Sequence, residues 1–83
     1  MRFDALAIKP ELFDVVAAVL ELPADRVSDD LSTANCETWD SLRHLRLVLA
    51  VEDHFAVSFD EVEIASLTSV STLLDAVTER LAR

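Results

Sequence analysis

The chain has 83 residues, of which 52% are hydrophobic and only 6% aromatic, and it contains no glycine. This length and composition predict one domain, spanning residues 1–83, with a single core of Leu, Val, Ala and Ile that suits closely packed helices. Sixteen Asp and Glu against seven Lys and Arg give a formal net charge of −9, which argues against nucleic acid and anionic membrane as partners, and the lack of glycine excludes a glycine-rich phosphate-binding loop.

The first predicted helix begins near Pro10, because proline is tolerated in a first helical turn and disfavoured inside a helix. Whether residues 3–8 extend it is left open by their mixed pattern. Pro23 ends this helix or follows it closely. Apolar residues at spacings of three and four predict its buried stripe, which consists of Leu12, Val15, Val16, Val19 and Leu20.

A long polar loop follows over residues 24–38, with Val27 and Leu31 as its expected anchors on the core. A connection of this length is usually functional or partly structured. Cys36 is the sole cysteine, so it can form neither an internal disulfide nor a zinc site, and it is expected to be a small half-buried residue. The single cysteine favours a cytoplasmic protein, and no segment predicts a membrane span or a signal peptide.

The second predicted helix covers residues 41–55 and carries the strongest helical pattern in the chain. Its expected buried side consists of Leu42, Leu45, Val48, Leu49 and Phe55, and Leu47 and Val51 widen that side. An apolar face this broad indicates either contacts with several helices or a hydrophobic surface left for a partner.

Two further helices complete a predicted all-α fold, a small bundle of three main helices and one short one. Ser58 and Asp60 are candidate caps for the short helix at residues 61–66, which Ile64 and Leu67 would hold on the core. The last helix begins near Thr68 or Ser69, and its apolar series is Val70, Leu73, Leu74, Val77 and Leu81. Arg80 and Arg83 favour its C-terminal end.

Trp39-Asp40-Ser41-Leu42 marks the change from the polar loop to the second helix. Asp40 is predicted to be the N-cap, because its side-chain oxygen can accept a hydrogen bond from an amide of the first turn. Ser41 then lies beside unpaired backbone N–H groups, which would suit an attached phosphate.

Asp-Ser-Leu at a helix start, behind an acidic loop, resembles the modification site of acyl carrier proteins, and the resemblance covers nearly the whole chain. In that family a phosphopantetheinyl transferase attaches 4′-phosphopantetheine from coenzyme A to the serine, and the thiol of this arm holds an acyl group as a thioester. The resemblance implies that Ser41 is the attachment site, flanked by Asp40 and Leu42. It also implies a monomeric carrier without catalytic residues or metal ligands, which meets enzymes such as acyltransferases or ligases and ketosynthases.

Two departures from the family pattern bear on partners. Trp39 precedes Asp40, and this Trp-Asp-Ser-Leu version looks like discrete carriers of specialised pathways such as polyketide biosynthesis. The early part of the helix carries Arg43 and Arg46 where many members are acidic, and acids return only later. The residues expected to contact partners, a set of dedicated enzymes, are Trp39, Arg43, His44, Arg46, Glu52 and Asp53.

Several alternatives stay open from the sequence. Trp39 is either a partly buried plug at the loop–helix junction or an exposed contact residue. His44 could form a nucleophilic pair with Ser41, but no orienting group or oxyanion site is evident, and His54 is expected to be solvated. The chain could instead be an aminoacyl or peptidyl carrier, an unmodified acidic adaptor or, least supported, an independent enzyme.

Overall fold

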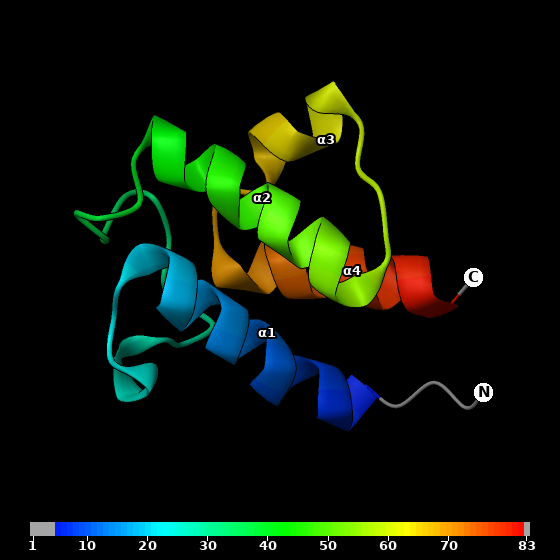
Figure 1. Ribbon diagram of the computed structural model, residues 1–83, viewed down its shortest axis with the longest axis horizontal. Helices are drawn as coiled ribbons and strands as arrows, with labels where there is room; N and C mark the ends of the chain where they lie inside the picture. Colours follow the sequence, from blue (N-terminus) through cyan, green and yellow to red (C-terminus); the bar gives the residue numbers. More distant parts are fainter. Residues whose placement is uncertain (1–4, 83) are drawn as a thin grey trace.

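The structure is a computed structural model that describes residues 5–82. In this part of the chain the regular structure is helical, apart from one antiparallel bridge between Ser32 and Ser69. The elements are α1 (Ala5–Leu20), a single 3₁₀ turn η1 (Ala24–Arg26), α2 (Ser41–Phe55), α3 (Glu61–Ser66) and α4 (Val70–Ala82). The prediction of an all-α fold with three main helices and one short helix is confirmed (Figure 1).

The helices alternate in direction so that one end of the bundle gathers the segments around residue 41. In Figure 1, α1 runs opposite to α2 and α4, and the long loop joins the end of α1 to the start of α2. The start of α2 therefore lies at the same end of the bundle as the end of α1. The predicted bounds of α2 and α3 are confirmed.

The start of α1 differs from the prediction. The helix begins at Ala5 and contains Pro10, so the expectation of a start near Pro10 is wrong, and the extension that the sequence left open is present over residues 5–8. Proline offers no N–H to the carbonyl of Leu6 four residues earlier, which costs a helix interior about 3 kcal/mol. Ile8 is 5% exposed and belongs to the core; burying such a side chain contributes about 1.5–3 kcal/mol, which offsets much of that cost. Residues 3 and 4, also left open by the sequence, lie outside the described residues.

Both long helices before α3 end in a left-handed residue although the chain has no glycine. Glu21 (φ 56°) follows α1 and Ala56 (φ 57°) follows α2. In each case the next amide bonds back to the carbonyl five residues earlier, from Leu22 to Ala17 at 2.9 Å and from Val57 to Glu52 at 3.1 Å. These are Schellman ends, in which a Cβ in the left-handed region costs about 1–2 kcal/mol relative to glycine.

The two short-range caps around α3 and α4 agree with the sequence. The side chain of Asp60 accepts a hydrogen bond from the amide of Glu63 at 2.7 Å. Ser69 Oγ accepts from the amide of Thr72 at 3.2 Å, while the amide of Ser69 donates to Thr72 Oγ1 at 3.1 Å. This reciprocal pair fixes the start of α4 directly after Ser69, as expected.

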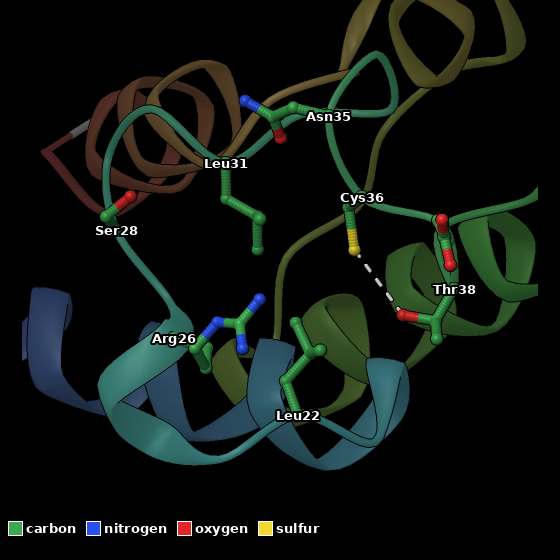
Figure 2. A pocket seen from close by; sticks show the side chains of 8 residues that line it. Leu22, Arg26, Ser28, Leu31, Asn35, Cys36 and Thr38 are labelled. Atoms are coloured by element: carbon green, nitrogen blue, oxygen red, sulfur yellow. Dashed lines mark hydrogen bonds between the residues drawn. The ribbon is translucent and has the colours of Figure 1, made fainter.

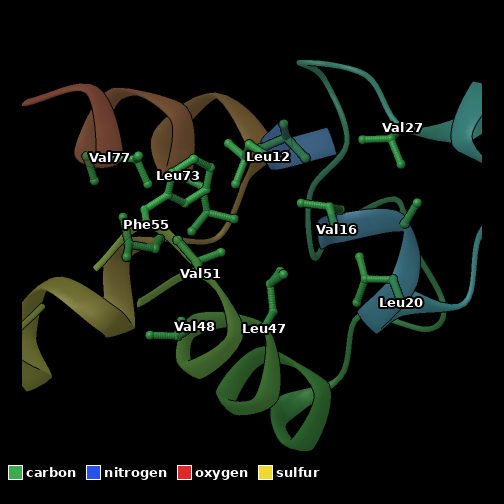
Figure 3. Packing of buried hydrophobic residues seen from close by; sticks show 14 of the residues in the cluster. Leu12, Val16, Leu20, Val27, Leu47, Val48, Val51, Phe55, Leu73 and Val77 are labelled. Atoms are coloured by element: carbon green, nitrogen blue, oxygen red, sulfur yellow. The ribbon is translucent and has the colours of Figure 1, made fainter. Parts of the chain in front are cut away.

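One hydrophobic core joins all three long helices (Figure 3). Its most buried side chains come from α1, α2 and α4 and are Leu12, Val16, Leu20, Leu47, Val48, Val51, Val70, Leu73 and Val77. From the long loop, Val27 is buried and Leu31 packs against the core as a half-buried residue. Both predicted loop anchors are therefore confirmed, as are the apolar stripes of α1 and α4.

The buried side of α2 is only partly the predicted one. Leu42, Leu45 and Leu49 are 61%, 53% and 60% exposed, so the expectation that they are buried is wrong. The helix is apolar on two sides, and the core takes the side of Leu47, Val48, Val51 and Phe55. Periodicity alone does not say which of two apolar stripes faces the core. The structure thus favours the open alternative of a hydrophobic surface left for a partner.

The long loop is tied to the connection between α3 and α4. The amide of Thr33 donates to the carbonyl of Thr68 at 3.0 Å, and the amide of Val70 donates to the carbonyl of Leu31 at 2.9 Å. This short antiparallel pairing holds the loop against residues more than 30 positions later in the chain. It thereby positions the segment that leads to α2.

Candidate functional site

Ser41 is the first residue of α2 and its side chain is exposed. Asp40 is its N-cap, as predicted: the side chain accepts from the amide of Arg43 at 2.8 Å, and the carbonyl accepts from the amide of His44 at 2.8 Å. Within residues 5–82, the amides of Ser41 and Leu42 are left without a protein partner. An exposed hydroxyl beside two free amides at the positive end of a helix suits an attached phosphate group.

His44 is held by two hydrogen bonds that fix its tautomer. The indole Nε1 of Trp39 donates to His44 Nδ1 at 3.0 Å, so Nδ1 carries no proton. The proton of the neutral ring is therefore on Nε2, which donates to the carbonyl of Ile64 in α3 at 2.8 Å. With both ring nitrogens engaged, His44 cannot accept the proton of Ser41, and the nucleophilic pair considered above is excluded.

Trp39 is 3% exposed, so the buried alternative is correct. Its ring leaves almost no surface for the partner contact that the sequence suggested. The same holds for the polar atoms of His44, which face Trp39 and Ile64 instead of solvent. Together Trp39, His44 and Ile64 form a chain of hydrogen bonds, named here the indole–imidazole link, that joins the loop, α2 and α3.

A cavity of about 450 Å³ lies directly beside Ser41. It is lined by residues from the loop, the start of α2, the end of α3 and the connection after α3, namely Thr33, Trp39, Asp40, Ser41, His44, Ala65 and Thr68. No local pattern in the sequence indicates that Thr33 and Thr68 line this cavity, because the two residues are brought together by the backbone pairing between the loop and the α3–α4 connection. The exposed hydroxyl therefore borders a hollow rather than a flat surface.

The two arginines of α2 have different environments. Nη2 of Arg43 lies 3.6 Å from Oε2 of Glu21, the residue after α1, so its charge is near the negative end of that helix. Its Nη1 is buried and has no partner in the described part of the chain. Arg46 is exposed. Of these two expected partner contacts, Arg46 is exposed and Arg43 is half-buried.

The two acids predicted to contact partners also differ. Glu52 is half-buried, and its Oε2 accepts a hydrogen bond from the amide of Phe59 at 2.8 Å. It therefore fixes the connection between α2 and α3, and the structure gives it an internal role. Asp53 is exposed and remains a candidate contact residue.

Arg80 connects α4 to α3 and to the segment before α3. The sequence predicted only that it lies near the C-terminal end of the last helix. Its Nε donates to the carbonyl of Ser58 at 3.1 Å, its Nη2 pairs with Glu63 of α3, and its guanidinium lies 5.3 Å from the centre of the Phe59 ring. These partners are 17 to 22 positions away in sequence, so local pattern offers no signal for them. Arg83 lies outside the described residues.

Cys36 lines a second cavity of about 480 Å³, between the long loop and the end of α1 (Figure 2). It is half-buried, as expected, and its Sγ lies 3.4 Å from Thr38 Oγ1.

His54 is exposed, as expected, and its Nε2 lies 3.9 Å from Glu11 Oε1. Among residues 5–82 no three His, Cys, Asp or Glu side chains are grouped to hold a metal ion. No helix in the same range has the length and hydrophobicity to cross a membrane.

Comparison with known proteins gives a consistent result. The model of the family described as "Phosphopantetheine attachment site" matches residues 10–77. The chain is 32% identical over 68 residues to acyl carrier protein 3 of Ralstonia nicotianae, covering 82% of this chain and 78% of that protein. It is also 32% identical over 73 residues to polyketide-8 synthase acyl carrier protein 2 of Streptomyces avermitilis, covering 88% and 84%.

A solved structure agrees with these matches. The solution structure of the holo acyl carrier protein from Geobacter metallireducens superimposes with a TM-score of 0.80 at 28% identity, covering 90% of this chain and 86% of that one. The expected cofactor, covalently attached 4′-phosphopantetheine, and the role of a carrier rather than an enzyme are thereby confirmed. This chain belongs to the acyl carrier protein family.

Proposed function

We propose that Ser41 carries the 4′-phosphopantetheine arm and that residues 1–83 act as a single acyl carrier domain. The observation that carries this proposal is the exposed hydroxyl at the first position of a capped helix, beside the free amides of Ser41 and Leu42. A phosphodiester there gains from the helix dipole, by roughly 0.3–1 kcal/mol at an exposed site. The matched family region, residues 10–77, includes this position.

The arm supplies a thiol that holds an acyl group as a thioester, and the protein body supplies a rigid place of attachment. Asp40 fixes the first turn of α2 through the amides of Arg43 and His44. The indole–imidazole link fixes the loop on one side of that turn and α3 on the other. A transferase would therefore meet the Ser41 hydroxyl in one defined position.

For the cargo, we infer acyl intermediates of polyketide or related specialised biosynthesis. The support is the Trp-Asp-Ser-Leu version of the motif together with the relative named as a polyketide-8 synthase carrier. The proposed partners are a phosphopantetheinyl transferase, an acyltransferase or ligase, and a ketosynthase. An aminoacyl or peptidyl carrier has the same site and stays the second candidate. The cytoplasmic location expected from the single cysteine stays a prediction.

Intact-protein mass spectrometry tests the attachment site directly. The apo-protein is incubated with a broad-specificity transferase, coenzyme A and magnesium. Wild type and Ser28→Ala, which removes an exposed loop serine, are expected to gain one phosphopantetheine unit, whereas Ser41→Ala gains none. A gain in Ser41→Ala contradicts the assignment of Ser41. No gain in wild type, while a control carrier is modified, also contradicts it and favours an unmodified adaptor.

A second step addresses the cargo. The holo-protein, which carries the phosphopantetheine arm but no acyl group, is incubated either with malonyl-coenzyme A and an acyltransferase or with an amino acid, ATP and an adenylating enzyme. The mass of the resulting thioester is then measured. Faster loading with the malonyl unit is expected. Selective loading with an amino acid would move the assignment to an aminoacyl carrier while leaving Ser41 as the attachment site.

A further inference from the structure

Trp39 precedes the N-cap of α2, and His44 is the fourth residue of that helix. Side chains at these two positions pack together in a hydrophobic staple, the contact that fixes the angle at which a chain enters a helix. Here the two rings are stacked, with 6.1 Å between their centroids and an interplanar angle of 28°. The indole N–H also donates to His44 Nδ1 at 3.0 Å, so this staple contains a hydrogen bond that a purely apolar pair lacks.

Ser41 lies inside the segment that the staple closes. The carbonyl of Asp40 accepts from the amide of His44 at 2.8 Å, and the ring of His44 accepts from the indole of Trp39. A backbone and a side-chain hydrogen bond thus join the two ends of residues 39–44. Trp39, Asp40 and His44 also line the cavity beside Ser41. A change in the angle between the loop and α2 would therefore move the walls of the space beside the Ser41 hydroxyl.

Only the neutral imidazole of His44 can form this staple. Its Nδ1 accepts from Trp39 while its Nε2–H donates to the carbonyl of Ile64 at 2.8 Å. A second proton on the ring would occupy Nδ1, and two N–H donors would then face each other. The Trp39 side chain is 3% exposed, so the indole N–H cannot turn to water without leaving its buried place. Protonation of His44 therefore opens the staple.

The charged groups around His44 are engaged elsewhere. Among the residues that line the cavity with it, Asp40 has the one other titratable side chain, and that carboxylate accepts from the amide of Arg43. The guanidinium of Arg43 is turned to the end of α1, and on α3 Glu63 pairs with Arg80. Within residues 5–82 none of these side chains forms an ion pair or hydrogen bond with the His44 ring. The surroundings thus hold the neutral ring through Trp39 and Ile64 alone.

We propose that His44 is a positioning residue for the attachment reaction at Ser41, that it acts through Trp39, and that it does so only while its imidazole is neutral. In that form the staple holds the loop and the start of α2 at one angle, and the transferase meets the hydroxyl in one place. In the protonated form the angle varies, and fewer encounters align the hydroxyl with the reacting phosphorus. The inference rests on the proposed function, because it concerns the modification of Ser41.

His44 touches no reacting atom in this reaction. Ser41 Oγ bonds to the phosphorus of coenzyme A that bears the pantetheine, the pyrophosphate bond breaks, and adenosine bisphosphate leaves with the bridging oxygen. The hydroxyl proton is lost to a base or to water. The contribution of His44 is therefore expected in the rate of the transfer step and its pH dependence, rather than in the affinity for the transferase.

The test uses the apo-protein with a broad-specificity phosphopantetheinyl transferase, coenzyme A and magnesium. The kcat and KM are measured at about pH 7.5 and about pH 5.5, where a free imidazole is mostly neutral and mostly protonated, respectively. The central variant is His44→Gln. One carbon separates the oxygen and nitrogen of its amide, as one carbon separates the two ring nitrogens, so glutamine can accept from Trp39 and donate to Ile64 without taking up a proton.

His54→Gln, at an exposed position on the same helix, is the matched control. Each variant is compared with wild type at the same pH, so that the pH dependence of the transferase itself cancels. Circular dichroism at both pH values verifies that each protein is folded. The NMR resonance of the indole N–H of Trp39, the only tryptophan, reports the staple independently of the transferase.

At about pH 7.5, His44→Ala should lower kcat about tenfold with little change in KM, whereas His44→Gln should stay within about twofold of wild type. Between the two pH values the ratio of wild type to His44→Gln in kcat/KM should fall about fivefold. The ratio of wild type to His54→Gln should change by less than about twofold. The indole resonance should shift with pH in wild type and stay in place in His44→Gln.

The outcomes separate the two proposals. If wild type gains no phosphopantetheine at either pH while a control carrier is modified, the proposed function fails and the inference fails with it. If loading is normal but the ratio of wild type to His44→Gln is the same at both pH values, the positioning inference is wrong and the carrier assignment stands. A loss of kcat in folded His44→Ala that His44→Gln shares also overturns it, because His44 would then act through packing or through contact with the transferase.

Discussion

Removing the imidazole of His44 should destabilise the protein more than its half-exposed position on α2 implies. His44→Ala deletes the acceptor of the Trp39 indole and the donor to the Ile64 carbonyl. The indole N–H is then an unpaired donor on a side chain that is 3% exposed, which costs about 1–3 kcal/mol, and the second bond contributes about 1 kcal/mol. The carbonyl of Ile64 keeps the amide of Leu67 at 3.2 Å and adds no further penalty, so the free energy of unfolding should fall by about 2–4 kcal/mol.

Urea unfolding measures this loss, with Trp39 as the only tryptophan reporting through its fluorescence. His54→Ala is the matched control, because it makes the same substitution at an exposed position on the same helix. Its expected effect is within about 0.5 kcal/mol. A loss for His44→Ala no larger than that of the control would refute the importance of the indole–imidazole link.

A double-mutant cycle identifies the source of the loss. In a Trp39→Phe background no indole N–H is left unpaired, so His44→Ala should cost only about 1 kcal/mol, the contribution of the bond to Ile64. Circular dichroism replaces fluorescence in this background. An undiminished cost would show that His44 acts through packing rather than through the indole.

The remaining predictions concern the helix ends. Pro10→Ala should raise the free energy of unfolding by about 1 kcal/mol or more in urea titration, because alanine restores the amide that the interior of α1 lacks; destabilisation would mean that the helix starts at Pro10 after all. Ala56→Gly should raise it by about 0.5–1 kcal/mol, since glycine removes the left-handed penalty but is more flexible when unfolded. The control Ala18→Gly, at an exposed helical position, should instead be destabilising by about 0.5–1 kcal/mol, and equal signs for the two variants would contradict the left-handed end of α2.

The helix bounds that depend on local chemistry could be predicted from the sequence. Asp40 and Asp60 each stand directly before an apolar helical pattern, and both cap the helices predicted after them. The start of α1 could not be found in this way, because it depends on the burial of Ile8 in the common hydrophobic core. The local preference of proline for a first helical turn is overridden there by tertiary packing.

The candidate site shows the same division. Ser41 and Asp40 stand where the sequence placed them, because capping is a contact between neighbours. The prediction that Leu42, Leu45 and Leu49 face the core was wrong. These leucines and the buried residues of α2 both have helical spacing, so only packing against the other helices decides which set is buried. The separate roles of Arg43 and Arg46 likewise depend on Glu21, which is 22 positions before the first arginine.

The backbone pairing between residues 31–33 and 68–70 has a consequence for the order of events during synthesis. Every residue of the loop before Ser41 leaves the ribosome well before Thr68 and Val70, whose backbone groups hold that loop in place. Contacts of such long sequence separation form late in folding, because the intervening chain must first be closed. A nascent chain that ends before α4 therefore displays the serine without its finished surroundings, and the complete attachment surface exists only once the last helix has docked.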